Sequence, residues 1–140
     1  MGAAKGSIAV NAPVATVYKR WLAFEDYPEF LTAIKRMQKL DANHFVILFV
    51  FGGKPYGATL EIMQRVPKRR LAWRTISNDH ATPQLAAAVV SFASLSDHGT
   101  RVTLKLTSRL GGVLSNRVNR YLRNFKQLVE KRSTNRKNSD

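Results

Sequence analysis

The sequence has no cysteine, no long apolar run and no apolar signal-peptide core near its start. Without thiols the chain has no disulfides, no thiolate metal sites and no cysteine nucleophile. Its apolar runs fall far short of the roughly 18 residues that a membrane-spanning helix needs. The start also misses the myristoylation pattern, because Gly6 stands where Ser or Thr is required. These absences predict a cytoplasmic protein with no transmembrane segment.

Acidic residues are scarce, with 9 Asp and Glu against 23 Lys and Arg and a net charge of +14. Residues 109–140 hold nine of the basic groups and only two acids. A field of this sign favours nucleic acid, ribosomes or an anionic membrane surface as partners. The alternative is a solvated helix face that only keeps the protein soluble. The candidate polyanion-binding residues are Arg117, Arg120, Arg123, Lys126, Lys131 and Arg132, followed by Arg136 and Lys137.

Positioned acid–base pairs are also missing. The carboxylates fall almost entirely in predicted loops or on polar faces, and Glu61 lies on the strand face opposite Leu60 and Ile62. The three histidines are at a strand end, in a linker and in a turn, which is typical of surface residues. Neither metal-ligand spacing, a Ser-His-Asp arrangement nor a phosphate-binding loop is visible. We therefore predict no catalytic residue, no metal site and no cofactor.

A long amphipathic segment is the clearest feature that is present. Residues 114–132 contain no Pro or Gly, and their apolar side chains recur with helical spacing. This pattern predicts a helix of about five turns. The helix needs another apolar surface to cover its stripe, which consists of Leu114, Val118, Tyr121, Leu122, Phe125, Leu128 and Val129.

The first thirty residues predict a strand followed by helical segments. Residues 7–10 read as an edge strand, and Asn11 and Pro13 suit the start of a helix over residues 13–24. The aromatic-rich stretch 24–31 contains Pro28, which discourages a continuous helix. We expect a short helical turn there, packed against an apolar surface or lining the rim of a pocket.

Six strand-like runs follow between residues 33 and 108. Residues 44–51 are apolar at successive positions, which predicts a strand covered on both faces. The last run alternates Val102, Leu104 and Leu106 with polar residues, as a strand with one buried face does. Short connections favour an antiparallel meander. We predict one α+β domain over residues 1–132, in which a curved antiparallel sheet of about seven strands wraps around the C-terminal helix, and a disordered tail over residues 133–140.

The order of four stretches resembles the polyketide cyclase/dehydrase and coenzyme-Q-binding branch of the START-like, helix-grip superfamily. These stretches are Ser7–Pro13 with Val17, Tyr18 and Trp21, then Phe24–Leu31, Pro67–Thr75, and the last helix with Phe125–Glu130. The resemblance covers about residues 6–131. It implies a helix-grip fold with a cavity between the sheet and the helix, which the family commonly uses for hydrophobic ligands. The chain departs from relatives at Leu85–Phe92, where three alanines replace a segment that often carries glycine.

Strand alternation and the helical stripe then select side chains that would face such a cavity. The predicted ligand-binding residues are Tyr27, Phe30, Tyr56, Leu60, Ile62, Trp73, Thr75, Val90, Phe92, Val118, Leu122 and Phe125. The alternative is that these side chains simply fill the core.

Three functions follow, in order of preference. The first is a carrier that shelters an isoprenoid quinone, a lipid or a polyketide-like ligand. The second is docking to ribosomal RNA or another polyanion through the basic helix face, as in the toxin-like, ribosome-associated branch of the superfamily. The third is a polyketide cyclase or aromatase using Tyr56, Thr75 or Gln64 as polar cavity groups.

Overall fold

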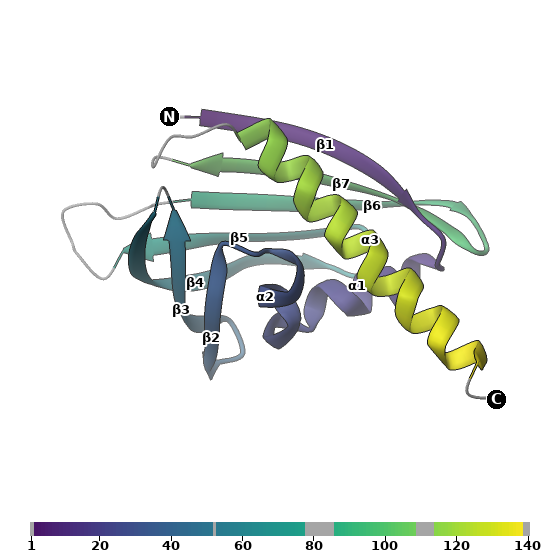
Figure 1. Cartoon of the computed structure of the whole chain (residues 1–140), viewed down its shortest axis with the longest axis horizontal. Helices are drawn as coiled ribbons and strands as arrows, with labels where there is room; N and C mark the ends of the chain where they lie inside the picture. The colour runs from purple at the N-terminus through teal and green to yellow at the C-terminus, as the bar shows by residue number, and fades with distance from the viewer. Residues whose placement is uncertain (1, 52, 78–85, 109–113, 139–140) are drawn as a thin grey trace.

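The computed structural model describes residues 2–51, 53–77, 86–108 and 114–138 (Figure 1). Seven strands form one antiparallel sheet in the order β1-β7-β6-β5-β4-β3-β2. From β2 to β7 each strand lies beside its sequence neighbour, which confirms the meander. The strands are β1 Gly2–Val10, β2 Ile34–Asp41, β3 His44–Phe51, β4 Lys54–Val66, β5 Arg70–Ser77, β6 Ala86–Ser96 and β7 Gly99–Ser108.

The helices lie on one side of this curved sheet. The long helix α3, Leu114–Asn138, crosses the concave face diagonally, as Figure 1 shows. The shorter elements α1 (Val14–Leu22), η1 (Phe24–Asp26) and α2 (Tyr27–Phe30) lie on the same side, with α1 next to β6 and β7 and α2 between α3 and β2. The observed order of elements confirms the predicted α+β helix-grip architecture.

The buried stripe of α3 forms its contact with the sheet. Val118, Leu122 and Phe125 are almost completely buried, and the helix packs mainly on β1. Gly6 of β1 allows this close approach. A Cβ atom there would lie 2.9 Å from both Val118 Cγ1 and Asn119 Oδ1. Glycine therefore lets the helix settle directly on the strand backbone.

Alternation along the strands places one face in the core. Leu60 and Ile62 of β4 are buried, as predicted, together with Ala58, and so are Val102 and Leu104 of β7. The prediction that residues 44–51 are covered on both faces is wrong. Val46 and Leu48 are each 38% exposed, whereas the alternate residues of β3 are buried. Within the described residues the helices pack on the concave side, so the convex side of β3 faces solvent.

The boundaries of β1, α1 and α3 differ from those that the sequence pattern predicts. Strand β1 begins at Gly2 rather than residue 7, and α1 begins at Val14 and ends at Leu22. Helix α3 continues beyond Arg132 to Asn138, so residues 133–138 are helical rather than disordered. Each residue added to an existing helix avoids the cost of nucleation, and no Gly or Pro interrupts this segment. The polar stretch 77–83, which the sequence predicts as the linker that holds His80, lies mostly outside the described residues, as do residues 139–140.

The described part of the chain contains no helix that is both long enough and apolar enough to span a membrane.

Candidate ligand-binding site

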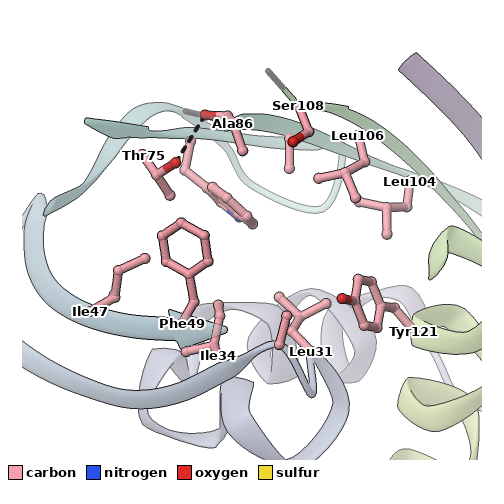
Figure 2. A pocket seen from close by; sticks show the side chains of 13 residues that line it. Leu31, Ile34, Ile47, Phe49, Thr75, Ala86, Leu104, Leu106, Ser108 and Tyr121 are labelled. Carbon is pink, nitrogen blue, oxygen red and sulfur yellow. Dashed lines mark hydrogen bonds between the residues drawn. The ribbon is translucent and has the colours of Figure 1, made fainter. Parts of the chain in front are cut away.

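A cavity of about 70 Å³ lies between the sheet and α3, near the start of β6 and the end of β7 (Figure 2). Strands, the segment after α2 and the first half of α3 all contribute to its wall. The lining residues are Leu31, Ala33, Ile34, Ile47, Phe49, Trp73, Thr75, Ala86, Ala88, Leu104, Leu106, Ser108 and Tyr121.

Strand register explains why these side chains meet. Trp73 pairs with Ala88 across β5 and β6, and Ala88 pairs with Leu106 across β6 and β7. Paired residues in an antiparallel sheet project from the same face. The alanine stands between two large side chains and does not fill the space between them. The cavity therefore depends on small residues at 86 and 88 in the middle of the sheet.

The cavity wall is almost entirely carbon. The Thr75 hydroxyl donates to the carbonyl oxygen of Ala86 over 3.4 Å. Ser108 is buried and already takes part in an interaction within the protein. Figure 2 shows the Tyr121 ring reaching from α3 toward Leu31, with its hydroxyl at the cavity. An apolar wall with few polar groups is typical of sites for hydrophobic ligands.

A cluster of aromatic side chains fills the core next to the cavity. It consists of Trp21, Phe24, Tyr27, Phe30 and Phe125, whose rings contact one another at centroid distances such as 4.8 Å for Trp21 and Phe125. The Tyr27 hydroxyl donates to the carbonyl oxygen of Trp21 over 2.8 Å. Burial raises the pKa of Tyr27 well above its ordinary value, so this phenol stays protonated.

Trp73 connects the aromatic cluster with the cavity. Its ring centroid lies 6.3 Å from that of Tyr27. Its indole nitrogen is buried and makes no well-aligned hydrogen bond within the described residues. The same indole nevertheless lowers the pKa of Tyr27, against the larger effect of burial. Trp73 therefore packs on the aromatic cluster and lines the cavity at the same time.

The structure brings only part of the predicted ligand-binding set to the cavity. Trp73 and Thr75 line it, and Tyr56 stacks on the lining residue Phe49 with centroids 5.3 Å apart. Tyr27, Phe30 and Phe125 belong to the aromatic cluster instead. The remaining predicted residues lie in the core without lining the cavity, namely Leu60, Ile62, Val90, Phe92, Val118 and Leu122. Alternation identified their inward direction but not their position along each strand.

Sequence reasoning missed the strand β3 side of the cavity. Ile47 and Phe49 were assigned to a strand covered on both faces, so their common face was not distinguished. Alternation within that run would not have revealed it, because every residue from Phe45 to Phe51 is apolar. Tyr121 was recognised as part of the helical stripe but not as a lining residue. The sequence pattern places Ala88 on one strand face with Val90 and Phe92, but it identifies Ala86 only as part of a departure from relatives.

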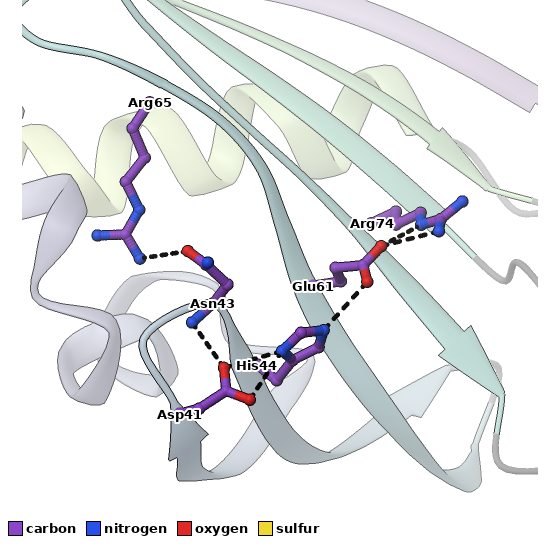
Figure 3. A network of polar contacts seen from close by, with 6 residues as sticks. All are labelled: Asp41, Asn43, His44, Glu61, Arg65 and Arg74. Atoms are coloured by element: carbon purple, nitrogen blue, oxygen red, sulfur yellow. Dashed lines mark hydrogen bonds and ion pairs between the residues drawn. The ribbon is translucent and has the colours of Figure 1, made fainter.

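A polar network lies on the opposite, convex face of the sheet (Figure 3). His44 Nδ1 contacts Asp41 Oδ1 at 2.8 Å, and His44 Nε2 contacts Glu61 Oε2 at 3.0 Å. Arg74 Nε donates to Glu61 Oε1 over 2.8 Å. These four residues lie on neighbouring strands β2 to β5, which the side-chain contacts connect in a row. His44 is therefore not the isolated surface residue that the sequence predicted.

Each contact of the network shifts a pKa. Hydrogen bonds to Asp41 and then Glu61 raise the pKa of His44. The pKa of Asp41 is lowered by the backbone N–H of Asn43 and by His44, and that of Glu61 by His44 and Arg74. The network faces away from the cavity, so it is not positioned to act on a bound ligand.

The predicted polyanion-binding residues do not form one uniform face. Arg120, Arg123 and Lys131 are exposed. Lys126 donates to the carbonyl oxygen of Ala9 over 2.7 Å and pairs with Glu130 at 2.6 Å, which attaches α3 to the end of β1. Arg117 is half-buried and takes part in an interaction within the protein, and the side chain of Arg132 lies outside the described part.

Comparison with known proteins gives a match over most of the chain. The family model described as polyketide cyclase/dehydrase and lipid transport matches residues 10–129. An uncharacterized 17.2 kDa protein of Streptomyces lincolnensis is 31% identical over 144 residues, covering 94% of this chain and 92% of that protein.

Solved structures show the same fold. The Zhui aromatase/cyclase from Streptomyces sp. R1128 matches with a TM-score of 0.77 at 13% identity, over 94% of this chain and 95% of that one. A START superfamily protein from Mycobacterium smegmatis matches with a TM-score of 0.67 at 13% identity, over 93% and 95%. At such identities the likeness concerns the fold.

Proposed function

Because this chain belongs to the polyketide cyclase/dehydrase and lipid transport family, we propose that it binds and shelters a hydrophobic small molecule between the sheet and α3. The observation that supports the proposal most is the carbon-lined cavity beside Trp73 and Ala88. Burial of apolar ligand surface there contributes about 25 cal/mol per Å². An isoprenoid quinone, a lipid and a polyketide-like molecule are the ligand classes under consideration.

The size of the cavity limits how such a ligand binds. Its volume is about 70 Å³. Sites that enclose whole drug-sized ligands have volumes of roughly 300–1,000 Å³. Only a small part of the ligand therefore enters without movement of the wall, and the rest lies at the rim or outside.

Binding alone fits the cavity better than turnover. Among the polar groups considered for a cyclase, Thr75 lines the cavity, Tyr56 lies behind Phe49, and Gln64 is exposed. The described lining residues include no carboxylate, histidine or lysine to serve as a general base. The carboxylates and the histidine of the polar network are on the other face of the sheet.

Native mass spectrometry of protein purified without detergent tests the proposal. We expect an adduct that is lost on denaturation and on extraction with organic solvent. The Ala88→Leu variant fills the cavity and should carry no adduct. Ala87→Leu is the matched control, because Ala87 pairs with Arg74 on the convex face and does not line the cavity. An adduct that persists unchanged in Ala88→Leu would contradict binding at this site.

A further inference from the structure

The cavity is smaller than an aromatic ring requires. A cavity of about 150 Å³ in another protein binds benzene. The cavity here has about half that volume, at about 70 Å³. A single ring does not fit without displacing side chains, and a fused-ring polyketide or a quinone head needs still more space. The slender end of an aliphatic chain fits the same volume with least change.

The surrounding structure resists enlargement on two sides. Behind Trp73 lies the aromatic cluster, in which Tyr27 contacts Trp21 and Phe30 at centroid distances of 5.9 and 5.3 Å. On the helix side, α3 is seated on β1 through the close approach at Gly6 and is held there by the Lys126 contact with Ala9. Closely packed side chains of this kind move only at a cost in packing. The wall that carries Tyr121 therefore stays close to the sheet.

The polar groups of the wall also disfavour an oxygen-rich ring. The Thr75 hydroxyl donates its hydrogen to Ala86, and Ser108 is engaged within the protein. The Tyr121 hydroxyl and the indole N–H of Trp73, which has no hydrogen-bond partner among the described residues, are the remaining side-chain donors on lining residues. A polyketide with more than two oxygens would bury acceptors without partners, which is unfavourable. A hydrocarbon end needs no partner.

From these three observations we infer that the cavity takes the end of an unbranched aliphatic chain and that the polar head of the ligand remains outside. This inference depends on the proposed function and narrows its ligand classes to molecules with an acyl or alkyl chain. Aromatic polyketides and quinone heads are excluded from the cavity itself.

Titration of methyl-labelled protein followed by NMR tests the inference. The ligands are octanoate and octan-1-ol, which share a chain and differ in the head, and 2-naphthol and 1,4-naphthoquinone, which are rings. We expect both chain compounds to shift the methyl signals of Ala88, Leu104 and Ile47. Their affinity should exceed that of the rings by on the order of tenfold.

Three variants make the test specific for cavity volume. Ala88→Leu should abolish the shifts caused by octanoate, whereas Ala87→Leu should leave them unchanged. Leu106→Ala removes side-chain volume from the half-buried part of the wall and should raise ring affinity without raising chain affinity. Thermal melting of each variant establishes that it is folded.

The outcomes separate the inference from the proposed function. Rings that shift the same methyl signals of the wild-type protein with equal or higher affinity would overturn the inference and leave the proposed function in place. If neither chains nor rings shift these signals, the proposed function itself fails.

Discussion

His44 connects two carboxylates on the convex face, and its protonation affects the stability of that part of the sheet. Both ring nitrogens face carboxylate oxygens, so the doubly protonated imidazolium satisfies both contacts. The pKa of His44 is raised from 6.5, so its contribution is complete below pH 6.5 and is lost as pH rises through the raised value. The lowered pKa values of Asp41 and Glu61 affect stability in the acidic part of the pH range. Their contribution is complete above pH 3.8 and 4.5, respectively, and is lost as pH falls through the lowered values.

Replacing His44 by Gln should therefore lower the melting temperature mainly between the ordinary carboxyl and imidazole values of 4.5 and 6.5. The effect should be a few °C at most, because the network is exposed to solvent. Thermal melts of wild type and variant at several pH values provide the measurement. The difference should shrink as the pH rises beyond the raised pKa of His44.

The matched control for this prediction is His98→Gln. His98 is exposed in the turn between β6 and β7, and its ring makes no ion pair with the described residues. Its substitution should cause a small change without the same pH dependence. A melting-temperature difference for His44→Gln that is constant from pH 5 to pH 9 would show that the ion pairs are not responsible.

The contact between β1 and α3 depends on one glycine. The Cβ atom that Gly6→Ala adds would meet Val118 Cγ1 and Asn119 Oδ1 at 2.9 Å. Asn119 is exposed and has room to turn away, whereas Val118 is fully buried and its branched side chain is stiff. We expect Gly6→Ala to lower the free energy of unfolding by about 1–3 kcal/mol, measured by urea denaturation.

A second glycine serves as the comparison. The Cβ added by Gly99→Ala would come no closer than 3.2 Å to a side-chain oxygen, Ser96 Oγ, at the half-buried start of β7. That variant should lose less stability than Gly6→Ala. Equal losses of unfolding free energy would mean that both substitutions act through strand propensity rather than through the packing of α3 on β1.

The two faces of β3 should respond differently to truncation. Ile47 is 2% exposed and Val46 is 38% exposed, although they are neighbours in the same apolar run. Ile47→Ala should cost about 2–5 kcal/mol of the free energy of unfolding. Val46→Ala should change it by only about 0.5 kcal/mol. Urea denaturation of both variants checks the prediction, and similar losses would indicate that the convex face of β3 is covered after all.

For the whole molecule, the net charge of +14 predicts attraction to polyanions, but the cations differ in their availability. Arg120, Arg123 and Lys131 are exposed on α3, while Lys126 is bound to Ala9 and Glu130. Reversing the three exposed charges to Glu should lower the salt concentration at which the protein elutes from heparin.

An equal change of charge elsewhere provides the control. Lys5, Arg101 and Lys105 are exposed on β1 and β7, where Lys5 lies opposite Lys105. If α3 is the polyanion-binding element, reversing this second set should lower the elution salt less than reversing the first. Equal reductions would show that net charge alone is responsible and that α3 has no special role.

The sequence alone was sufficient for the type, number and order of the elements. Helical spacing identified α3, and period-two alternation identified the inner faces of β4 and β7, because local periodicity reflects whether one face of an element is buried. The sequence also identified the aromatic stretch that forms η1 and α2. Strand alternation identified Trp73 and Thr75 as inward-facing residues. The order of these patterns carried the resemblance to the helix-grip superfamily.

Only the tertiary structure decided where empty space remains. Periodicity shows that a side chain points inward, but it does not show what lies opposite. The curvature of the sheet and the close packing of α3 on Gly6 bring the side chains of the aromatic cluster together over one part of the core. Over another part, no large side chain fills the space next to Ala86 and Ala88. The pairing of β2, β3 and β4 likewise brings His44 between Asp41 and Glu61. Such juxtapositions arise from register and packing between segments far apart in the chain, which no local pattern records.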